Sequence, residues 1–143
     1  MSQVDAAREV DAYHHLSAYT LTRGDATFIH QHVVDAWAAQ HATPTGKPIA
    51  LAFALVGLYL HLEKGFTGRQ VQRAHMKLAQ RRRAWPRFTL PSARGTMTAI
   101  DVIAARAGPA RDRAVDQWCA SVWGCHAENR VRVQELLAEY GMG

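Results

Sequence analysis

Long hydrophobic segments are scarce in this chain of 143 residues, and the longest covers only the 14 residues from Ile49 to Leu62. A membrane-spanning helix needs about 20 apolar residues, so we interpret this segment as a buried core helix. The first residues include acids and no apolar stretch, and we therefore expect no secretory signal. These absences predict a soluble protein without a membrane partner, and we expect it in the cytoplasm.

Cysteine is also rare, and its two positions argue against a local disulfide. Cys119 and Cys125 lie six residues apart in a helical stretch, which corresponds to about 600° of rotation and places the thiols on different faces. Free thiols are typical of a reducing compartment. Short catalytic and metal-binding signatures are absent as well, because the chain contains no HExxH, ExxH, CxxC or GxSxG.

The composition is that of a globular, helical protein. Hydrophobic residues make up 48% and charged residues 20% of the chain, which excludes a disordered or collagen-like protein. Alanine is abundant and β-branched residues are modest in number, which favours helix over strand. The net charge of +5 at pH 7 is compatible with an acidic partner.

Turn and capping residues divide the chain into helical segments. Gly24 ends the first segment, and Asp25 is a good N-cap for the second. Thr67 and Thr98 each precede Gln70 or Asp101 by three residues, which is the spacing of a capping box. Gly124 is expected to interrupt the helix that contains it. We expect helices over residues 6–22, 26–41, 48–64, 67–84, 98–107, 110–123 and from there through 139.

The segment lengths predict an all-α fold in a single domain of residues 1–143. Short connections between the first four helices favour an antiparallel helical bundle of about four helices, with the C-terminal helices packed across it. Residues 86–97 contain two prolines and a glycine, and we interpret them as an extended, ordered connection.

Three stretches of the sequence carry a resemblance to a known family. They are YHHLSAYTLTRGDATFIHQHVVDAWAAQ (13–40), FALVGLYLHLEKGFTGRQVQRAHMKLAQ (53–80) and WP.F.LP (85–91). Over nearly its whole length the chain resembles a family of small bacterial proteins described as a domain of unknown function. The family has no assigned activity, so the resemblance implies a domain extent and no reaction. Its members usually continue after the last Trp with a Ser-Pro-His-His helix start, where this chain has GCHA at 124–127.

Eight histidines are present, and helical geometry predicts which of them point inward. At 100° per residue, His30 and His41 fall within the apolar arc of the second helix, while His32 and Asp35 fall on its opposite side. His75 lies among the inward residues of the fourth helix.

Two further positions complete this set. His61 ends a stripe of small residues in the third helix, one turn beyond Gly57. His14 and His15 are neighbours in the first helix, so at most one of them can point directly inward. Histidines from at least three helices are therefore predicted to face the interior.

The first functional hypothesis is an internal histidine-lined site. Helical bundles hold metal ions with imidazoles from facing helices, and zinc, iron or copper accepts such ligands. The site would bind one divalent metal or a small ligand, and its histidines would also suit acid–base catalysis in an enzyme. The predicted ligands are His30, His61, His75 and His14 or His15, and the predicted supporting residues are Asp35, Glu63 and Tyr59.

A second hypothesis rests on clustered cations and aromatic residues near the fourth helix. Such a surface can contact nucleic acid phosphates and stack on bases, or bind an acidic protein or a small carboxylate or phosphate. The same cations also suit a helix C-terminus, where they interact with the helix dipole. The candidate residues are Arg81, Arg82, Arg83, Arg87, Arg94 and Trp85.

The third hypothesis assigns the histidines a structural role. A histidine on an apolar helix face commonly forms a hydrogen bond with a backbone carbonyl or a tyrosine. The protein would then act through contacts with a partner or as a homo-oligomer. The sequence leaves these three hypotheses open.

Overall fold

The computed structural model describes residues 2–81 and 84–142, and in these ranges it contains seven α-helices, one 3₁₀ turn and no strand. The predicted all-α fold is thus confirmed. Among the described helices, none has the length and apolar character needed to cross a membrane. The elements are α1 (Gln3–Thr22), α2 (His30–Gln40), α3 (Pro48–Lys64), α4 (Gly68–Arg81), α5 (Ala99–Ala104), α6 (Pro109–Cys125), η1 (Ala127–Asn129) and α7 (Arg130–Ala138).

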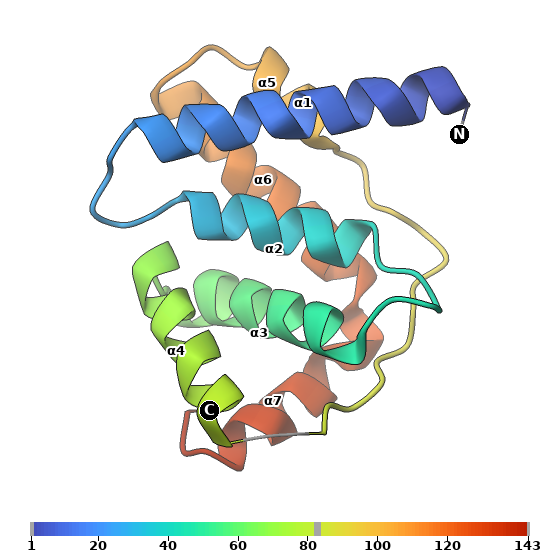
Figure 1. The fold of residues 1–143 in the computed structure, drawn as a ribbon, viewed down its shortest axis with the longest axis vertical. Helices are drawn as coiled ribbons and strands as arrows, with labels where there is room; N and C mark the ends of the chain where they lie inside the picture. Colours follow the sequence, from blue (N-terminus) through green and yellow to red (C-terminus); the bar gives the residue numbers. More distant parts are fainter. Residues whose placement is uncertain (1, 82–83, 143) are drawn as a thin grey trace.

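The helices form a bundle around α2. The first three helices run side by side with alternating direction, and α4 packs on α2 and α3 (Figure 1). The helix α6 lies behind them against α2, α3 and α5, while α5 packs on α1 (Figure 1). The predicted bundle with C-terminal helices across it is therefore confirmed, and α2 contacts four other helices.

The core draws on every helix and is closed by α6. Trp118 of α6 is fully buried, and its indole Nε1 donates a hydrogen bond to Gln40 Oε1 of α2 at 3.0 Å. Cys119 is also fully buried, and neither cysteine forms a disulfide. Eight of the 17 residues of α3, from Ala52 to Leu60, are buried, which agrees with its interpretation as a core helix.

Both predicted capping boxes are present. Thr67 Oγ1 accepts a hydrogen bond from the Gln70 amide at 3.2 Å, and Gln70 Oε1 accepts one from the Thr67 amide at 2.8 Å. Thr98 and Asp101 form the equivalent pair at the start of α5. These caps satisfy backbone N–H groups that a helix leaves unpaired at its N-terminus.

The predicted start of the second helix is wrong by four residues. Asp25 does accept hydrogen bonds, from the amides of Thr27 at 2.9 Å and Ile29 at 3.2 Å, but it closes a turn rather than a helix. Phe28 has a φ of +59°, in the left-handed region, and α2 begins only at His30. This turn crosses the start of α4, where the Arg69 amide donates to the Thr27 carbonyl at 2.9 Å.

The interruption expected at Gly124 is present but lies slightly later, because α6 continues through Gly124 to Cys125 and η1 then separates it from α7. A glycine weakens a helix without ending it when the surrounding contacts favour the helix. The shorter extent of α5, which ends at Ala104 rather than near 107, is a smaller difference.

Two helical glycines should respond in opposite ways to alanine. A Cβ at Gly68 would lie 1.8 Å from the Phe28 carbonyl oxygen, whereas nothing lies within 4 Å of a Cβ at Gly124. We expect Gly68→Ala to lower the free energy of unfolding by about 2–3 kcal/mol or more, since a backbone atom must move. We expect Gly124→Ala to raise it by about 0.5–1 kcal/mol. Urea unfolding measures both, and equal effects would contradict the packing described for Gly68.

Candidate functional site

The three histidines predicted to share an internal site each have a different partner. His30 Nδ1 forms a hydrogen bond with the Thr20 hydroxyl at 2.9 Å. His75 is buried, and its Nε2 donates to the Phe53 carbonyl at 2.7 Å. His61 Nδ1 donates to the Phe66 carbonyl at 2.9 Å. These partners are separate, so at least one nitrogen of each ring is engaged locally.

The prediction that His14 or His15 points inward is wrong. Both side chains are exposed on α1, because the buried face of this helix is formed by other positions, including Ala12 and Leu16. Two adjacent residues differ by about 100° in direction, and both fall outside the narrow buried stripe of α1.

The placement of His32 and Asp35 on an outer face is also wrong, since they are only 4% and 2% exposed. Helix α2 has neighbours on several sides, so a residue opposite its apolar arc is covered by another helix. The ring of His32 stacks on that of His61 with a centroid separation of 3.5 Å and an interplanar angle of 16°.

The stacked pair holds one neutral and one readily charged ring. Burial, reinforced by the neighbouring His61, lowers the pKa of His32 to about 4. Burial alone would lower the pKa of His61 as well, but its 2.8 Å hydrogen bond to Asp116, its bond to Phe66 and the carboxylate charge outweigh burial and raise that pKa. Both nitrogens of His61 face acceptors, an arrangement that favours the imidazolium form.

Asp35 is the most isolated acid of the described residues. Gln31 Nε2 donates to its Oδ1 at 3.0 Å, while Oδ2 is buried without a hydrogen-bond partner. Burial raises the pKa of Asp35 well above its usual value, and the Gln31 hydrogen bond opposes this only in part. Oδ2 faces Gly57 of α3, where a Cβ would lie at 1.9 Å. The acid therefore fills the space left by the glycine between α2 and α3.

The other predicted supporting residues lie elsewhere. Glu63 binds Arg130 Nη2 at 2.5 Å and accepts a hydrogen bond from Trp123 Nε1 at 2.8 Å. Tyr59 is buried, and its hydroxyl lies 3.5 Å from Gln134 Nε2. Within residues 2–81 and 84–142, neither residue forms a hydrogen bond or ion pair with His30, His61 or His75.

Residues 2–81 and 84–142 include no group of three or more His, Cys, Asp or Glu side chains placed to hold a metal ion. Zinc, iron or copper sites in proteins are built from such groups. Metal binding stays a prediction from the sequence, and the geometry of the described residues adds no support to it.

The predicted basic surface is divided among several environments. Arg81 is exposed at the end of α4, and Arg82 and Arg83 lie outside the described residues. Arg94 Nη2 binds Glu9 Oε1 at 2.6 Å. The Trp85 ring packs edge-on against Phe53 with a centroid separation of 5.1 Å. The aromatic ring thus anchors the connection on the bundle.

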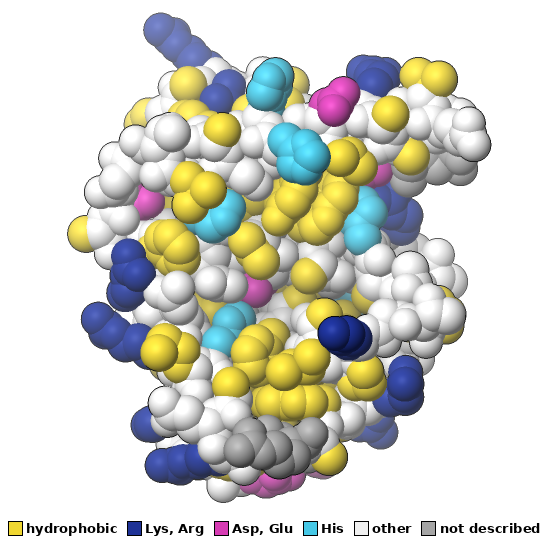
Figure 2. All heavy atoms as spheres, in the orientation of Figure 1, with side chains coloured by type: hydrophobic (Ala, Val, Ile, Leu, Met, Phe, Trp, Pro, Cys, Tyr) yellow, Lys and Arg dark blue, Asp and Glu magenta, His cyan; other side chains and the backbone are white. Residues whose placement is uncertain are grey.

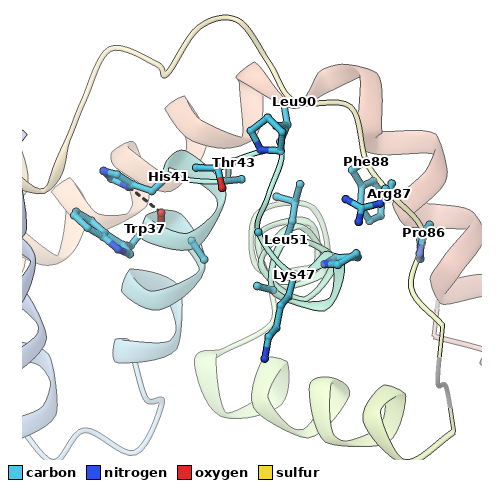
Figure 3. Close-up of a pocket in the computed structure, with 15 residues that line it drawn as sticks. Trp37, His41, Thr43, Lys47, Leu51, Pro86, Arg87, Phe88 and Leu90 are labelled. Carbon is cyan, nitrogen blue, oxygen red and sulfur yellow. Dashed lines mark hydrogen bonds between the residues drawn. The ribbon is translucent and has the colours of Figure 1, made fainter. Parts of the chain in front are cut away.

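A cavity of about 480 Å³ lies where the C-terminal end of α2, the N-terminal end of α3 and the 86–90 connection meet. Figure 3 shows Trp37 and His41 on one side of it and Pro86, Arg87 and Phe88 on the other, with Leu51 between them. The lining residues are Trp37, Ala38, His41, Ala42, Thr43, Pro44, Gly46, Lys47, Pro48, Ala50, Leu51, Pro86, Arg87, Phe88 and Leu90.

The aromatic wall of the cavity is held by stacking. The Trp37 ring lies between two others, with centroid separations of 4.3 Å from Tyr13 and 3.7 Å from His41. His41 Nδ1 also donates to the Trp37 carbonyl at 3.0 Å, and its Nε2 lies 2.9 Å from Glu9 Oε1. The indole therefore has little freedom to turn.

The opposite wall is held by α7 and by the turn before it. Arg132 Nη1 donates to the Arg87 carbonyl at 2.6 Å. The Asn129 side chain both accepts from the Thr89 amide at 2.9 Å and donates to the Thr89 carbonyl at 2.8 Å. The extended connection predicted from its prolines is therefore held through its backbone at Arg87 and Thr89.

A second cavity of about 290 Å³ adjoins the first. The two share His41, Ala42 and Leu90, and the smaller one also contacts Arg94 and His126. His126 is buried, with Nε2 donating to the Ala39 carbonyl at 3.2 Å and Nδ1 3.0 Å from Asn129 Nδ2. His126 thus supports the cavity walls rather than offering a free nitrogen.

Sequence reasoning missed this cavity as a site, although it identified its parts. The ATPTGKP segment at 42–48 follows the second predicted helix, and the WP.F.LP motif at 85–91 overlaps the predicted extended connection; both contribute walls. Because these segments lie about 40 positions apart, no periodicity within either one indicates that they face each other. The sequence signal for the cavity was the presence of prolines in both segments, together with Trp37 shortly before the first of them.

Acid should destabilise the protein through its buried histidines. Burial lowers the pKa of His75 to about 4, so between pH 6.5 and 4 the unfolded chain binds more protons at this position and stability is lost as pH falls. Between pH 7 and pH 4.5 the free energy of unfolding should fall in both proteins, and we expect the fall to be about 2–3 kcal/mol smaller in His75→Gln than in the wild type. Urea unfolding at the two pH values tests this, with exposed His14→Gln as control, and an unchanged loss would contradict it.

Asp116 should set the charge of His61. Asp116→Asn removes the carboxylate bonded to His61 Nε2, so the pKa of His61 should fall, as an NMR titration would show. A raised folded pKa adds stability that is complete below the unfolded pKa of about 6.5 and is lost as pH rises through the folded pKa. The variant should therefore lose more stability at pH 5.5 than at pH 8.5. Glu128→Gln, at an exposed acid, is the control, and a pKa of His61 that does not move would refute the assignment.

Comparison with known proteins adds a family and no activity. No curated protein and no solved structure matches this chain. A family model described as "Family of unknown function (DUF5946)" matches residues 10–127, which include most of α1, all of α2 to α6 and the residues that line both cavities. The match confirms the resemblance inferred from the sequence. The chain belongs to this family of unknown function.

Proposed function

We propose that this protein binds a small organic anion with an apolar body in the cavity between Trp37 and Phe88. The observation that carries the proposal is an apolar cavity whose charged lining residues, among those described, are Lys47 and Arg87, with no acid. The proposal keeps the small-ligand part of the first sequence hypothesis and moves it to the end of the bundle. Metal binding and catalysis stay predictions.

The size and walls of the cavity suit a small molecule. Ligand pockets typically have volumes of about 300–1,000 Å³ and mostly apolar walls with a few polar groups, and the cavity of about 480 Å³ lies in this range. Trp37, whose ring faces are covered by Tyr13 and His41, lines one wall, and Phe88 and Leu51 offer apolar surface. A flat or branched apolar group would replace water at these walls, which is favourable.

The charges at the cavity favour an anion. Lys47 and Arg87 are both exposed, so each side chain is free to turn toward a bound group. A guanidinium binds carboxylate, sulfonate or phosphate through paired hydrogen bonds, and an ammonium acts as a point charge. Arg94, another cation of the predicted basic surface, already forms an ion pair with Glu9. The ligand class that fits is therefore an amphipathic carboxylate or a similar anion.

The cavity is also largely preformed. Stacking holds Trp37 on one side, and the Arg132 and Asn129 hydrogen bonds hold the connection on the other. Three prolines among the lining residues, Pro44, Pro48 and Pro86, restrict the backbone further. A preformed cavity lowers the entropy cost of binding.

A pair of fluorescent probes tests the proposal. The probe 8-anilinonaphthalene-1-sulfonate carries an anionic group, and N-phenyl-1-naphthylamine has a similar aromatic body without one. We expect Lys47→Gln with Arg87→Gln to weaken sulfonate binding about fivefold to tenfold, since charge-assisted contacts are lost, and to leave amine binding unchanged. We expect Leu51→Trp to fill the cavity and weaken both probes at least tenfold.

The controls separate the cavity from general charge and from unfolding. Arg106→Gln with Arg113→Gln removes two exposed cations that do not line the cavity, and it should leave both affinities unchanged. Near-ultraviolet circular dichroism should show that every variant keeps its fold. If the folded wild type binds neither probe, or if Leu51→Trp leaves both affinities intact, the proposal fails.

A further inference from the structure

The charges of this protein are strongly segregated along the chain. Residues 64–100 contain nine of the 17 Lys and Arg residues and none of the 12 Asp and Glu residues. The rest of the chain carries the other eight cations and all 12 acids. The net charge of +5 is therefore the sum of a strongly basic segment and a remainder in which acids outnumber cations.

Helix α4 gathers four of these cations on its outer surface. Arg69, Arg73, Lys77 and Arg81 recur every fourth residue and are all exposed. Four residues correspond to about 400° of rotation and about 6 Å of rise, so the cations form a row that winds by about 120° around the helix from Arg69 to Arg81. Figure 2 shows Lys and Arg side chains along the edge of the molecule where α4 runs in Figure 1. We call these four residues the α4 row.

Most of the α4 row is not neutralised within the protein. Arg73, Lys77 and Arg81 form no ion pair with a residue in the described ranges, whereas five ion pairs elsewhere involve Glu9, Glu63, Asp112 or Asp116. Arg69 is partly engaged, lying 4.6 Å from the Phe28 ring centroid and donating to Gln72 Oε1 at 2.8 Å. Three neighbouring cations are thus available for an external anion.

The neighbourhood of the row indicates which kind of polyanion it fits. The apolar side of α4, with Val71, Ala74 and Leu78, is buried in the core, so this helix has no free apolar face to insert into a membrane. The Trp85 ring is packed on Phe53, so this aromatic is held in the fold rather than presented for stacking on a base. What remains is a row of cations of the kind that contacts phosphates without reading bases.

We infer that the outer face of α4 binds the phosphate backbone of double-stranded nucleic acid without sequence preference. A duplex presents about one negative charge per 1.7 Å of its axis, so a row of cations about 6 Å apart meets phosphates in many registers. This surface is separate from the proposed cavity, because none of the four residues lines it. The inference is therefore independent of the small-ligand proposal.

Salt-dependent binding to a labelled 20-base-pair DNA duplex of mixed sequence tests the inference. For three phosphate contacts the slope of log K against log salt should be about −2.7, a loss of about fortyfold between 50 and 200 mM KCl. We expect Arg73→Gln, Lys77→Gln and Arg81→Gln together to weaken binding at least tenfold at 50 mM KCl and to bring the slope near zero. Fluorescence anisotropy measures both quantities.

A charge-matched variant makes the test specific to α4. Arg8→Gln, Arg106→Gln and Arg113→Gln remove the same number of exposed cations from positions outside α4, and binding should then change less than threefold. Glutamine keeps helix propensity close to that of Arg and Lys, and circular dichroism checks the fold of both variants. Equal losses in the two variants, no binding at 20 mM KCl, or binding to anionic vesicles but not to the duplex would each overturn the inference.

Discussion

The fold depends on the burial of α2, which contacts α1, α3, α4 and α6. A helix covered on several sides must find partners inside the protein for its polar residues. Gln40 does so with Trp118 and with the carbonyls of Arg94 and Met97, and His32 does so by stacking on His61. Asp35 does so only in part, and it stays close to α3 because Gly57 leaves room for it. The position of α2 therefore sets how closely its neighbours can pack.

The burial of α2 also explains why the predicted histidines do not form one common site among the described residues. His75, His61 and His126 each donate to a carbonyl of a neighbouring segment, at Phe53, Phe66 and Ala39 respectively. Tyrosines, which sequence reasoning also offered as partners, do not take this role in the described hydrogen bonds of these rings. Burial lowers the pKa of His75 and His126 and favours their neutral imidazoles, and the carbonyl partners oppose this only in part, whereas Asp116 favours the charged form at His61.

The two proposed binding surfaces use different parts of the same basic segment. Arg87 turns from the 86–90 connection to the cavity, and Arg73, Lys77 and Arg81 face outward from α4. Arg94 joins neither, because Glu9 binds it. The sequence predicted one basic surface that includes Arg81, Arg87 and Arg94. The fold instead places these three on the outside of α4, at the cavity and in an ion pair with Glu9.

The sequence by itself determined the all-α fold, the caps at Thr67 and Thr98 and the buried character of α3, because these depend on neighbours within a few residues. Its helical geometry placed His75 correctly, since α4 has one buried side, and failed for His32 and Asp35, since α2 has several. Only the tertiary structure decided that the 42–48 turn, Trp37 and the 86–90 connection enclose a cavity. Local periodicity shows which side of a helix is apolar, but contacts between distant segments determine what covers the other sides.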